Sequence, residues 1–403
     1  MIPFAPPYID DDVIKEVTDS LRSGWITTGP KVRELESKVS EFTNAPKTLC
    51  VNSATSALIF ALKWFGVKEG DEVIVPAYTY CSTALSVLHL GATPVMVDCG
   101  EDFNIDVQKI ISVITERTKV IIPVDIAGYP CDYNELFEIV NDPQIKTLYQ
   151  PSTVEQKDLG RILILADSAH SFGAEYNGKN TGSIADITIF SFHAVKNLTT
   201  AEGGAICFNL RAPFSNEELY NALRPLTLNG QTKDAFTKTV GNSWRYDVER
   251  LGYKINMPDV CAAIGLAQFS KYNEILARRM EIFDLYTSKF AEYDWAVTPP
   301  YKTINKKSSC HVFLLRIKDI SEIQRDLIIE EIYKQEVSVN VHFVPLPSLT
   351  LFKNMNYDIK DYPVSHDSFS HEISLPIYPQ LTNSQVDTII NSVVNAYNIV
   401  IKN

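Results

Sequence analysis

Short apolar runs alternate with segments of helical periodicity through the first half of the chain. The runs are continuously apolar and rich in Ile and Val, which is typical of strands covered on both faces. They are EVIVP (72–76), PVMVD (94–98), KVIIPV (119–124), ILILA (162–166), ITIF (187–190) and AICF (205–208). Helical patterns at 54–65, 80–90 and 106–114 fall between some of them. This alternation predicts an α/β fold with a largely parallel sheet that carries helices on both faces.

Two amphipathic helices are expected ahead of the sheet. Apolar residues recur at helical spacing over 13–21 and again over 32–42. Acidic residues crowd the start of the first helix, and Gly24 follows its end. The loop between the helices, residues 24–30 with the sequence GWITTGP, carries an aromatic side chain and two hydroxyls.

The pattern changes after about residue 255, where a smaller second unit begins. A long helical stretch from Pro258 towards Tyr293 leads into it. The elements expected beyond that stretch are a strand at 311–317, a helix at 321–335, a strand at 338–343 and a terminal helix near 384–400. We therefore predict a large domain at 1–255 and a small C-terminal domain at 256–403. Residues 142–160 are polar and aperiodic, which indicates an excursion from the large domain.

Composition agrees with two domains and excludes several classes of protein. At 403 residues the chain exceeds the ~250–300 at which single cores stop growing. Its net charge of −12 argues against a general nucleic-acid coat or a basic membrane-surface protein, so neither partner is expected. The seven cysteines are scattered and never spaced C-x-x-C, which fits a reducing cytoplasm. The start, MIPFAPPYIDDDV, lacks a signal-peptide pattern, and no apolar run approaches the ~20 residues of a membrane span.

Several nucleotide and metal signatures are absent or incomplete. No G-x-G-x-x-G motif follows a predicted strand. Residues 173–180 resemble a Walker A loop, but Asn180 replaces the hydroxyl that should hold Mg²⁺. Asn177-Gly178 favours a hairpin turn instead. The histidines form no pair with metal-ligand spacing, so no metal site is predicted.

Two residues of opposite charge follow neighbouring predicted strands. Asp167 comes directly after ILILA, and Lys196 lies shortly after ITIF. Ligands of open α/β sheets bind outside the carboxyl ends of the strands. Spacing alone leaves a structural ion pair, or a lysine that extends to solvent, about as acceptable as a functional site.

Longer motifs resemble the DegT-type aminotransferases, a family of pyridoxal-phosphate enzymes that act on nucleotide-linked keto sugars. The matching segments are GWITTGP (24–30), DSAH (167–170), SFHAVKNL (191–198), EGG (202–204), GYKINM (252–257) and LPIYP (375–379). The resemblance covers nearly the whole chain. It implies the type I fold of pyridoxal-phosphate-dependent transferases, with a mostly parallel sheet and a smaller C-terminal α+β domain. It also implies a homodimer whose active sites are shared between the subunits.

The same resemblance assigns roles around the cofactor ring. Lys196 would bind the cofactor aldehyde covalently and then act as the general acid–base, since an amine is needed for both tasks. Asp167 would pair with the pyridine nitrogen, and His170 would hydrogen-bond the ring hydroxyl. Tyr80 matches the aromatic residue that stacks on the ring, although an ordinary core tyrosine remains an alternative.

The cofactor phosphate is expected at the start of a helix. Ala54 and Thr55 open the segment after Ser53, and free amides at a helix N-terminus suit phosphate. Ser53 alone would indicate only an N-cap. Ser191 matches a further phosphate ligand. Lys254 stands where many relatives have an Asn that reaches the phosphate from the partner subunit, and whether it contacts phosphate or substrate stays open.

Three further residues match positions near the substrate of relatives. Trp25 and Thr28 lie in the loop at 24–30, and His342 lies in VHFVPL (341–346). A packing role is an equal alternative for each. The stretch at 142–160 is longer than usual for the family and could decorate a dimer edge or form a substrate wall.

The reaction implied is a transamination in two halves. L-Glutamate would donate its amino group to the cofactor, which would then aminate a keto-deoxy sugar on a nucleoside diphosphate. One alternative is a sugar dehydratase that uses the same cofactor, but relatives of that kind replace the lysine at 196 with histidine. The other is a catalytically inactive binding or regulatory protein, which would not need Asp167, Lys196, Ser191 and Tyr80 together.

Overall fold

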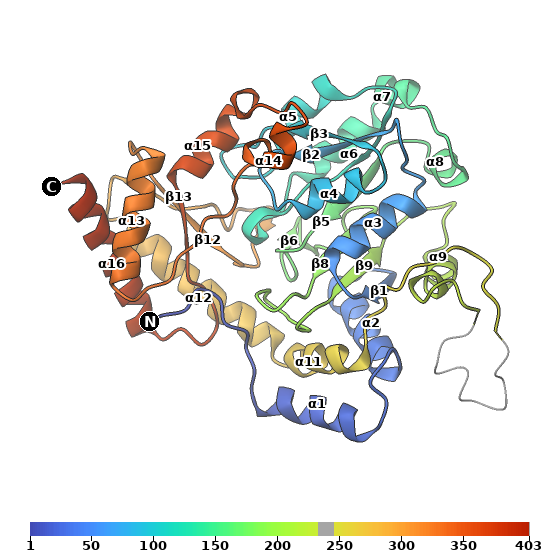
Figure 1. Cartoon of the computed structure of the whole chain (residues 1–403), viewed down its shortest axis with the longest axis horizontal. Coiled ribbons are helices and arrows are strands. Elements are labelled where there is room, and N and C mark those ends of the chain that lie inside the picture. The colour runs from blue at the N-terminus through green and yellow to red at the C-terminus, as the bar shows by residue number, and fades with distance from the viewer. Residues whose placement is uncertain (233–245, 403) are drawn as a thin grey trace.

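A seven-stranded sheet forms the centre of the computed structural model, which describes residues 1–232 and 246–402 (Figure 1). The strand order is β1-β9-β8-β5-β4-β2-β3, and only β9 runs antiparallel to its neighbours. The strands are β1 (Lys47–Val51), β2 (Glu72–Pro76), β3 (Thr93–Val97), β4 (Thr118–Ile121), β5 (Leu163–Asp167), β8 (Ile187–Ser191) and β9 (Gly204–Phe208). All six predicted apolar runs are therefore strands, and the predicted α/β class with a mostly parallel sheet is confirmed.

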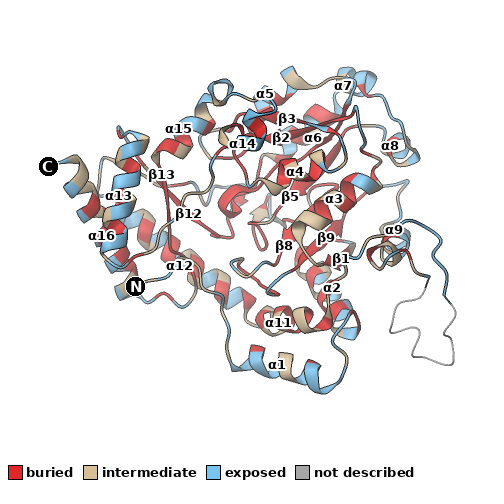
Figure 2. Cartoon of the chain, viewed as in Figure 1, coloured by how far each residue is buried: buried red, intermediate tan, exposed pale blue. Residues whose placement is uncertain are grey.

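Alternate residues of a strand enter different cores, which is why the runs are apolar on both faces and not only at every second position. In β5, Leu163 and Leu165 pack in the cluster that contains α3, whereas Ile164 packs in the cluster of α6. Figure 2 shows the strands buried between helices on both sides. The helices of this part are α1 (Asp11–Arg22), α2 (Pro30–Thr43), α3 (Ala54–Trp64), α4 (Ser82–Leu88), α5 (Val107–Ile110), α6 (Tyr133–Asn141), α7 (Pro143–Leu148), α8 (Val154–Leu159) and α9 (Asn216–Leu223).

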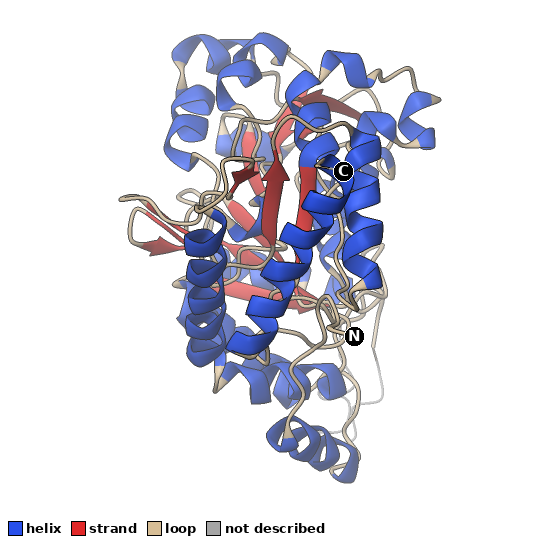
Figure 3. Cartoon of the chain, turned by 90° about the vertical axis from the view of Figure 1, so that its left-hand side faces the viewer, coloured by secondary structure: helices blue, strands red, loops and turns tan. Residues whose placement is uncertain are grey.

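A second, smaller sheet lies in the C-terminal part. It has the order β10-β12-β13, and the helices beside it bury a core of their own. Figure 3, seen from that side, shows these helices in front of the strands. The elements are α11 (Asp259–Phe269), α12 (Tyr272–Phe290), β10 (Ala296–Val297), β12 (Phe313–Ile317), α13 (Glu322–Lys334), α14 (Thr350–Lys353), α15 (Pro363–His371), β13 (Glu372–Leu375) and α16 (Asn383–Ile401).

The predicted hairpin is present. Strands β6 (Glu175–Tyr176) and β7 (Lys179–Asn180) pair across Asn177-Gly178, both of which have positive φ. A third short strand, β11 (Lys306–Lys307), pairs with β6. The turn interpretation of this segment is therefore confirmed, and the Walker A resemblance is excluded.

Three predicted elements are wrong or incomplete. The helical stretch from Pro258 is broken between α11 and α12 at residues 270–271. The segment 142–160, expected only as an aperiodic excursion, contains two short helices, α7 and α8, behind the N-caps Asp142 and Thr153. The segment 338–343 is not a strand, because only Asn340 within it forms a bridge to β13. Two residues further on, the backbone N–H of His342 donates to the side chain of Glu372.

The division into 1–255 and 256–403 stays a prediction. Helix α11 follows that boundary, yet it packs against α1 and α2. At the other end of the chain, Ile2 bridges to Val337. Within 1–232 and 246–402, no helix is long and apolar enough to cross a membrane.

Candidate active site

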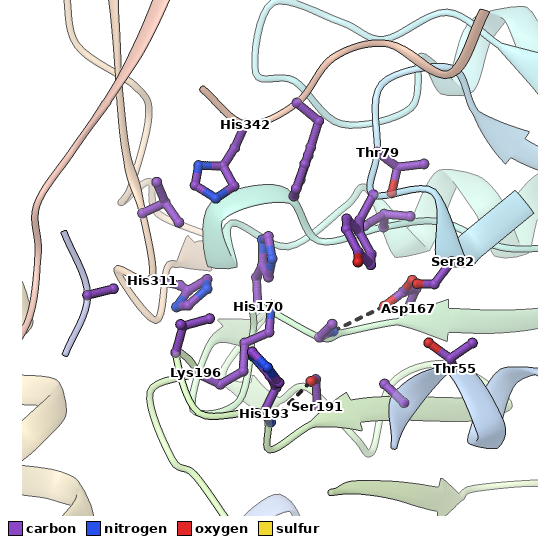
Figure 4. A pocket seen from close by; sticks show the side chains of 18 of the residues that line it. Thr55, Thr79, Ser82, Asp167, His170, Ser191, His193, Lys196, His311 and His342 are labelled. Atoms are coloured by element: carbon purple, nitrogen blue, oxygen red, sulfur yellow. Dashed lines mark hydrogen bonds between the residues drawn. The ribbon is translucent and has the colours of Figure 1, made fainter. Parts of the chain in front are cut away.

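A cavity of about 450 Å³ opens at the carboxyl ends of the parallel strands (Figure 4). Asp167 ends β5 and Ser191 ends β8, which is its neighbour in the sheet. Most of the predicted site residues line this cavity: Ala54, Thr55, Tyr80, Asp167, His170, Ser191, Lys196 and His342. Residues more than a hundred positions apart in sequence therefore meet because the sheet places the ends of their strands together.

Lys196 projects into the cavity from a loop after β8 that backbone hydrogen bonds hold in place. Backbone hydrogen bonds from Phe192 to Gly203 and from Thr200 to Phe192 close this loop at 2.9 and 2.8 Å. The residue is partly exposed because it lines the cavity. The surrounding protein desolvates its amine and lowers the pKa to about 8, an effect that the attraction of Asp167 partly opposes. About a tenth of the amine is therefore neutral, and hence nucleophilic, at pH 7.

Asp167 is buried and held by two donors. Its Oδ2 accepts a hydrogen bond from Thr83 Oγ1 at 2.8 Å, and its Oδ1 accepts one from the N–H of Ala169 at 3.3 Å. Burial raises the pKa of the carboxyl, while these donors and Lys196 favour the ionised form. The arrangement orients a carboxylate toward whatever occupies the cavity.

His170 offers a hydrogen-bond donor to the same space. Its Nδ1 accepts from the N–H of Ala127 at 3.2 Å, which places the ring hydrogen on Nε2 in the neutral form. Burial and the nearby Lys196 keep the pKa of His170 well below its usual value, so the ring is neutral. The ring also stacks at 5.7 Å on Phe343 and lies 4.5 Å from the ring of His311.

The start of α3 forms an anion cradle at the cavity. Ser53 caps the helix through the N–H of Ser56, at 3.1 Å. The N–H groups of Ala54 and Thr55 have no partner inside the helix and border the cavity. Gly204 makes this approach possible, since a Cβ there would lie 2.6 Å from the Ala54 nitrogen. Without a Cβ at this position, β9 can pack directly against the helix end.

Ser191 and Tyr80 complete the set of predicted cofactor residues in this cavity. The Oγ of Ser191 accepts a hydrogen bond from the N–H of His193 at 3.4 Å. Tyr80 is 58% exposed, and its ring lies 6.0 Å from Phe343 at an angle of 50°. An aromatic face thus stands at the open side of the cavity, where a planar ligand could stack.

The other three predicted residues lie outside this cavity. Thr28 Oγ1 donates to the carbonyl of Met257 at 2.6 Å and accepts from Asn256 Nδ2 at 2.6 Å. Trp25 Nε1 donates to the carbonyl of Thr28 at 3.3 Å. Lys254 is exposed, and its Nζ donates to Asn256 Oδ1 at 2.8 Å. We call residues 25–28 and 254–257 the loop cluster.

Sequence reasoning missed several residues that surround the cavity. Thr83, on α4, donates to Asp167 and lies 3.2 Å from the hydroxyl of Thr79, which lines the cavity, but no motif in the sequence marks it. His311 also lines the cavity, and its Nδ1 donates to Asn197 Oδ1 at 2.8 Å. Nothing in the sequence pattern ties His311 to Lys196, because it comes from the C-terminal part. Among residues 1–232 and 246–402, no group of three His, Cys, Asp or Glu side chains could hold a metal ion.

Comparison with known proteins gives relatives over the full length. The chain is 34% identical to the spore coat polysaccharide biosynthesis protein SpsC of Bacillus subtilis, over 97% of this chain and 96% of that protein. It is 32% identical to UDP-4-amino-4-deoxy-L-arabinose–oxoglutarate aminotransferase of Shewanella sediminis, over 97% of both.

A protein of known structure also matches the chain over its full length. The putative sugar aminotransferase Spr1654 from Streptococcus pneumoniae superposes in its PMP form with a TM-score of 0.95 and 46% identity, over 100% of both chains. In its PLP form the TM-score is 0.94 with 45% identity, over 99% of both. The model of the DegT/DnrJ/EryC1/StrS aminotransferase family matches residues 7–150 and 154–394. The chain therefore belongs to that family and is a pyridoxal-phosphate-dependent aminotransferase.

Proposed function

We propose that this aminotransferase moves an amino group from L-glutamate to a keto-deoxy sugar carried by a nucleoside diphosphate. The product would be an amino sugar for a cell-surface glycan such as lipopolysaccharide or O-antigen. One observation carries the proposal: a desolvated lysine amine, a buried carboxylate and the start of α3 face one cavity. The relatives' names support the substrates, since one is named for polysaccharide biosynthesis and another for a UDP-linked amino sugar and oxoglutarate. Oxoglutarate is what glutamate becomes when it gives up its amino group.

The residues of the cavity fit pyridoxal phosphate. When bound, this cofactor supplies an aldehyde that reacts with amines and a ring that accepts electrons from the reacting carbon. Lys196 would bind it through Nζ and afterwards carry the proton to and from the substrate carbon, a task suited to a pKa of about 8. Asp167 would hold a proton on the ring nitrogen, and Thr83 and Ala169 would keep that carboxylate oriented.

Other residues of the cavity would position the cofactor. The Nε2–H of His170 would donate to the ring hydroxyl. The N–H groups of Ala54 and Thr55 would bind the phosphate together with Ser191. Tyr80 would cover one face of the ring, and His342 would contact the sugar.

The loop cluster would serve a second copy of the chain. Lys254 is exposed and lies outside the cavity of its own chain, as expected of a residue that reaches the phosphate or the substrate of a partner. Trp25 and Thr28 would bring the 24–30 loop to the same shared site. We therefore propose a homodimer. The cysteines at all seven positions are free thiols, in keeping with the proposed cytoplasmic location.

The test is a cofactor titration followed by a substrate panel. Purified protein incubated with pyridoxal phosphate should acquire a visible absorbance band. With glutamate alone it should form no more than about one 2-oxoglutarate per active site, and continued formation should require a 3-keto or 4-keto sugar nucleotide as acceptor. A protein that stays colourless would contradict the assignment of the cavity residues. A coloured protein that fails on every sugar nucleotide would contradict the proposed substrate and favour a binding protein or a free keto sugar.

A further inference from the structure

A chain of hydrogen bonds leads from the cavity into the core of the small sheet. His342 lines the cavity, and its Nδ1 lies 2.8 Å from Ser374 Oγ. Ser374 Oγ lies 2.5 Å from Glu372 Oε1, while Glu372 Oε2 accepts the backbone N–H of His342 at 3.0 Å. Glu372 and Ser374 are both 0% exposed. The carboxyl therefore cannot reach the cavity itself and acts on it only through His342.

The backbone builds this arrangement. Glu372 and Ser374 are two residues apart on β13, so their side chains project from the same face. The segment that carries His342 lies beside β13 because Asn340 bridges to Ser374. Phe4 stacks on the imidazole at 5.6 Å and an angle of 21°, which fixes the plane of the ring.

A serine between a carboxyl and an imidazole has a single hydroxyl hydrogen, so the chain has two patterns. With Glu372 ionised, Ser374 donates to Glu372, His342 Nδ1–H donates to Ser374, and Nε2 is left as an acceptor. With Glu372 protonated, the carboxyl donates to Ser374, Ser374 donates to Nδ1, and the ring hydrogen sits on Nε2. The first pattern offers the cavity an acceptor and the second offers a donor.

We propose that Glu372 is a positioning residue: through Ser374 it decides which nitrogen of His342 carries the hydrogen, and so whether the cavity meets a donor or an acceptor. The proposal rests on the proposed function only for the identity of the ligand atoms to which His342 would donate. Keto and phosphate oxygens of a sugar nucleotide accept hydrogen bonds and cannot donate them. The Nε2–H form of His342 therefore selects such oxygens.

The surroundings favour the donor form at neutral pH. Burial raises the pKa of Glu372 to about 8, against the opposing effects of Ser374, the His342 N–H and Arg325 of α13. Tyr78, beyond β2, donates to the His342 carbonyl, and burial raises the pKa of its hydroxyl well above the usual value.

Across the cavity, His342 faces Lys196, His170 and His311. Burial and the charge of Lys196 lower the pKa of His342 to about 4, so its ring stays neutral from pH 6 upward. Within that range the ring exchanges tautomers rather than gaining charge. The exchange follows the titration of Glu372.

The experiment measures the tautomer directly. Holoenzyme labelled with ¹⁵N-histidine is titrated from pH 6.5 to 9.5, and the ring nitrogen shifts of His342 are identified by their loss in His342→Gln. We expect the hydrogen to move from Nε2 to Nδ1 with a midpoint near pH 8. Glu372→Gln should abolish the change, because its amide donates to Ser374 at every pH and holds the Nε2–H form. Ser374→Ala should also abolish it, by removing the link.

Glu322→Gln is the matched control. Glu322 faces the same Arg325, at 4.0 Å, but lies outside the hydrogen-bond chain, so the midpoint should not move. A tautomer that does not change with pH in the wild type would overturn the proposal, as would a change that persists in Glu372→Gln or Ser374→Ala. The measurement needs no sugar substrate, so its failure is distinct from failure of the proposed function. Once an accepting sugar nucleotide is known, its KM should rise above pH 8 in the wild type and stay level in Glu372→Gln.

Discussion

Two regions of the molecule are held together in different ways. One is the loop cluster, and the other is the cavity floor, by which we mean Asp167, His170, Ser191 and Lys196. On the floor, Asp167 and His170 are buried and hydrogen-bonded by neighbours in the same chain, and Lys196 projects from the loop after β8 beside them. In the loop cluster, Lys254 is exposed, and the hydroxyl of Thr28 is used to hold residues 256–257. Both regions lie in segments that resemble the family in sequence, although Lys254 departs from the Asn that many relatives have there.

The difference teaches what a single chain can complete. Neighbouring strands and the loops that follow them bring the floor residues to one point, so their geometry is set within one chain. The loop cluster lies outside its own cavity, so a role in catalysis requires a second molecule. The predictions below separate these two cases, beginning with the residue on which the floor depends.

Replacing Lys196 with Ala should have the largest effect. Removing the amine removes both the covalent bond to the cofactor and the proton carrier, so turnover should fall about 10²–10⁴-fold or more. The visible absorbance of the bound cofactor should shift or vanish in the same sample. Lys289→Ala, an exposed lysine on α12, is the control and should leave both unchanged. Wild-type turnover in Lys196→Ala would exclude the floor as the reaction site.

Replacing Asp167 with Asn should have the next largest effect on turnover. The amide matches the carboxylate in shape but cannot hold a proton on the ring nitrogen, so kcat should fall about 10²–10³-fold. Cofactor affinity should change far less, because the α3 cradle is untouched. Equal losses in affinity and kcat would contradict the assigned role. Thr83→Val removes only one donor to Asp167, so its kcat should lie between those of Asp167→Asn and the wild type.

The floor was largely predictable, because its residues follow strands that show in the sequence. ILILA is apolar at every position, and ITIF is apolar except at the buried Thr188, since both faces of β5 and β8 are covered; this fixes where Asp167 and Ser191 emerge. The roles around the ring came from the family resemblance, which no periodicity could supply. The floor therefore combines a local pattern with a recognised motif.

The strand pattern of the sequence could not predict which residues of the C-terminal part lie at the cavity. Segment 338–343 has strand-like composition, but the backbone N–H of His342 donates to the carboxyl of Glu372 and not to the backbone of a neighbouring strand. His311 and Glu372 reach the site or its edge only through tertiary packing. The break in the helix after Phe269 likewise leaves the apolar pattern almost unchanged.

Lys254→Ala tests whether the loop cluster serves a partner. One charge-assisted hydrogen bond contributes about 1.5–3 kcal/mol, so affinity for the cofactor or the sugar nucleotide should fall about 10–100-fold. Mixing Lys254→Ala chains with Lys196→Ala chains gives hybrids in which one site has both native residues. Activity of the mixture should exceed that of either variant alone. Hybrids that form without any gain would place Lys254 outside the shared site.

The pH dependence of cofactor capture tests the desolvation of Lys196. Burial lowers the pKa of the amine to about 8 from 10.5, so the reactive neutral form should increase about tenfold between pH 7 and 9 and then level off. The rate of covalent capture by the apoprotein, followed by absorbance, should trace this curve. A rate that keeps rising beyond pH 10 would show a solvated lysine and would place it with exposed residues such as Lys254.

The smallest change is expected from Thr28→Val, which removes a buried hydroxyl from the loop cluster. The carbonyl of Met257 then loses a donor and Asn256 Nδ2 loses an acceptor, so the free energy of unfolding should fall by about 1–3 kcal/mol. Thr18→Val, a half-buried helix position whose hydroxyl donates an exposed hydrogen bond to the carbonyl of Ile14, is the matched control and should change it by less than about 0.5 kcal/mol. Measuring the KM for the sugar nucleotide in the same variant decides what the hydroxyl does. A raised KM with unchanged stability would show that Thr28 contacts substrate, and its bond to Met257 would then not be what holds the two halves of the loop cluster together.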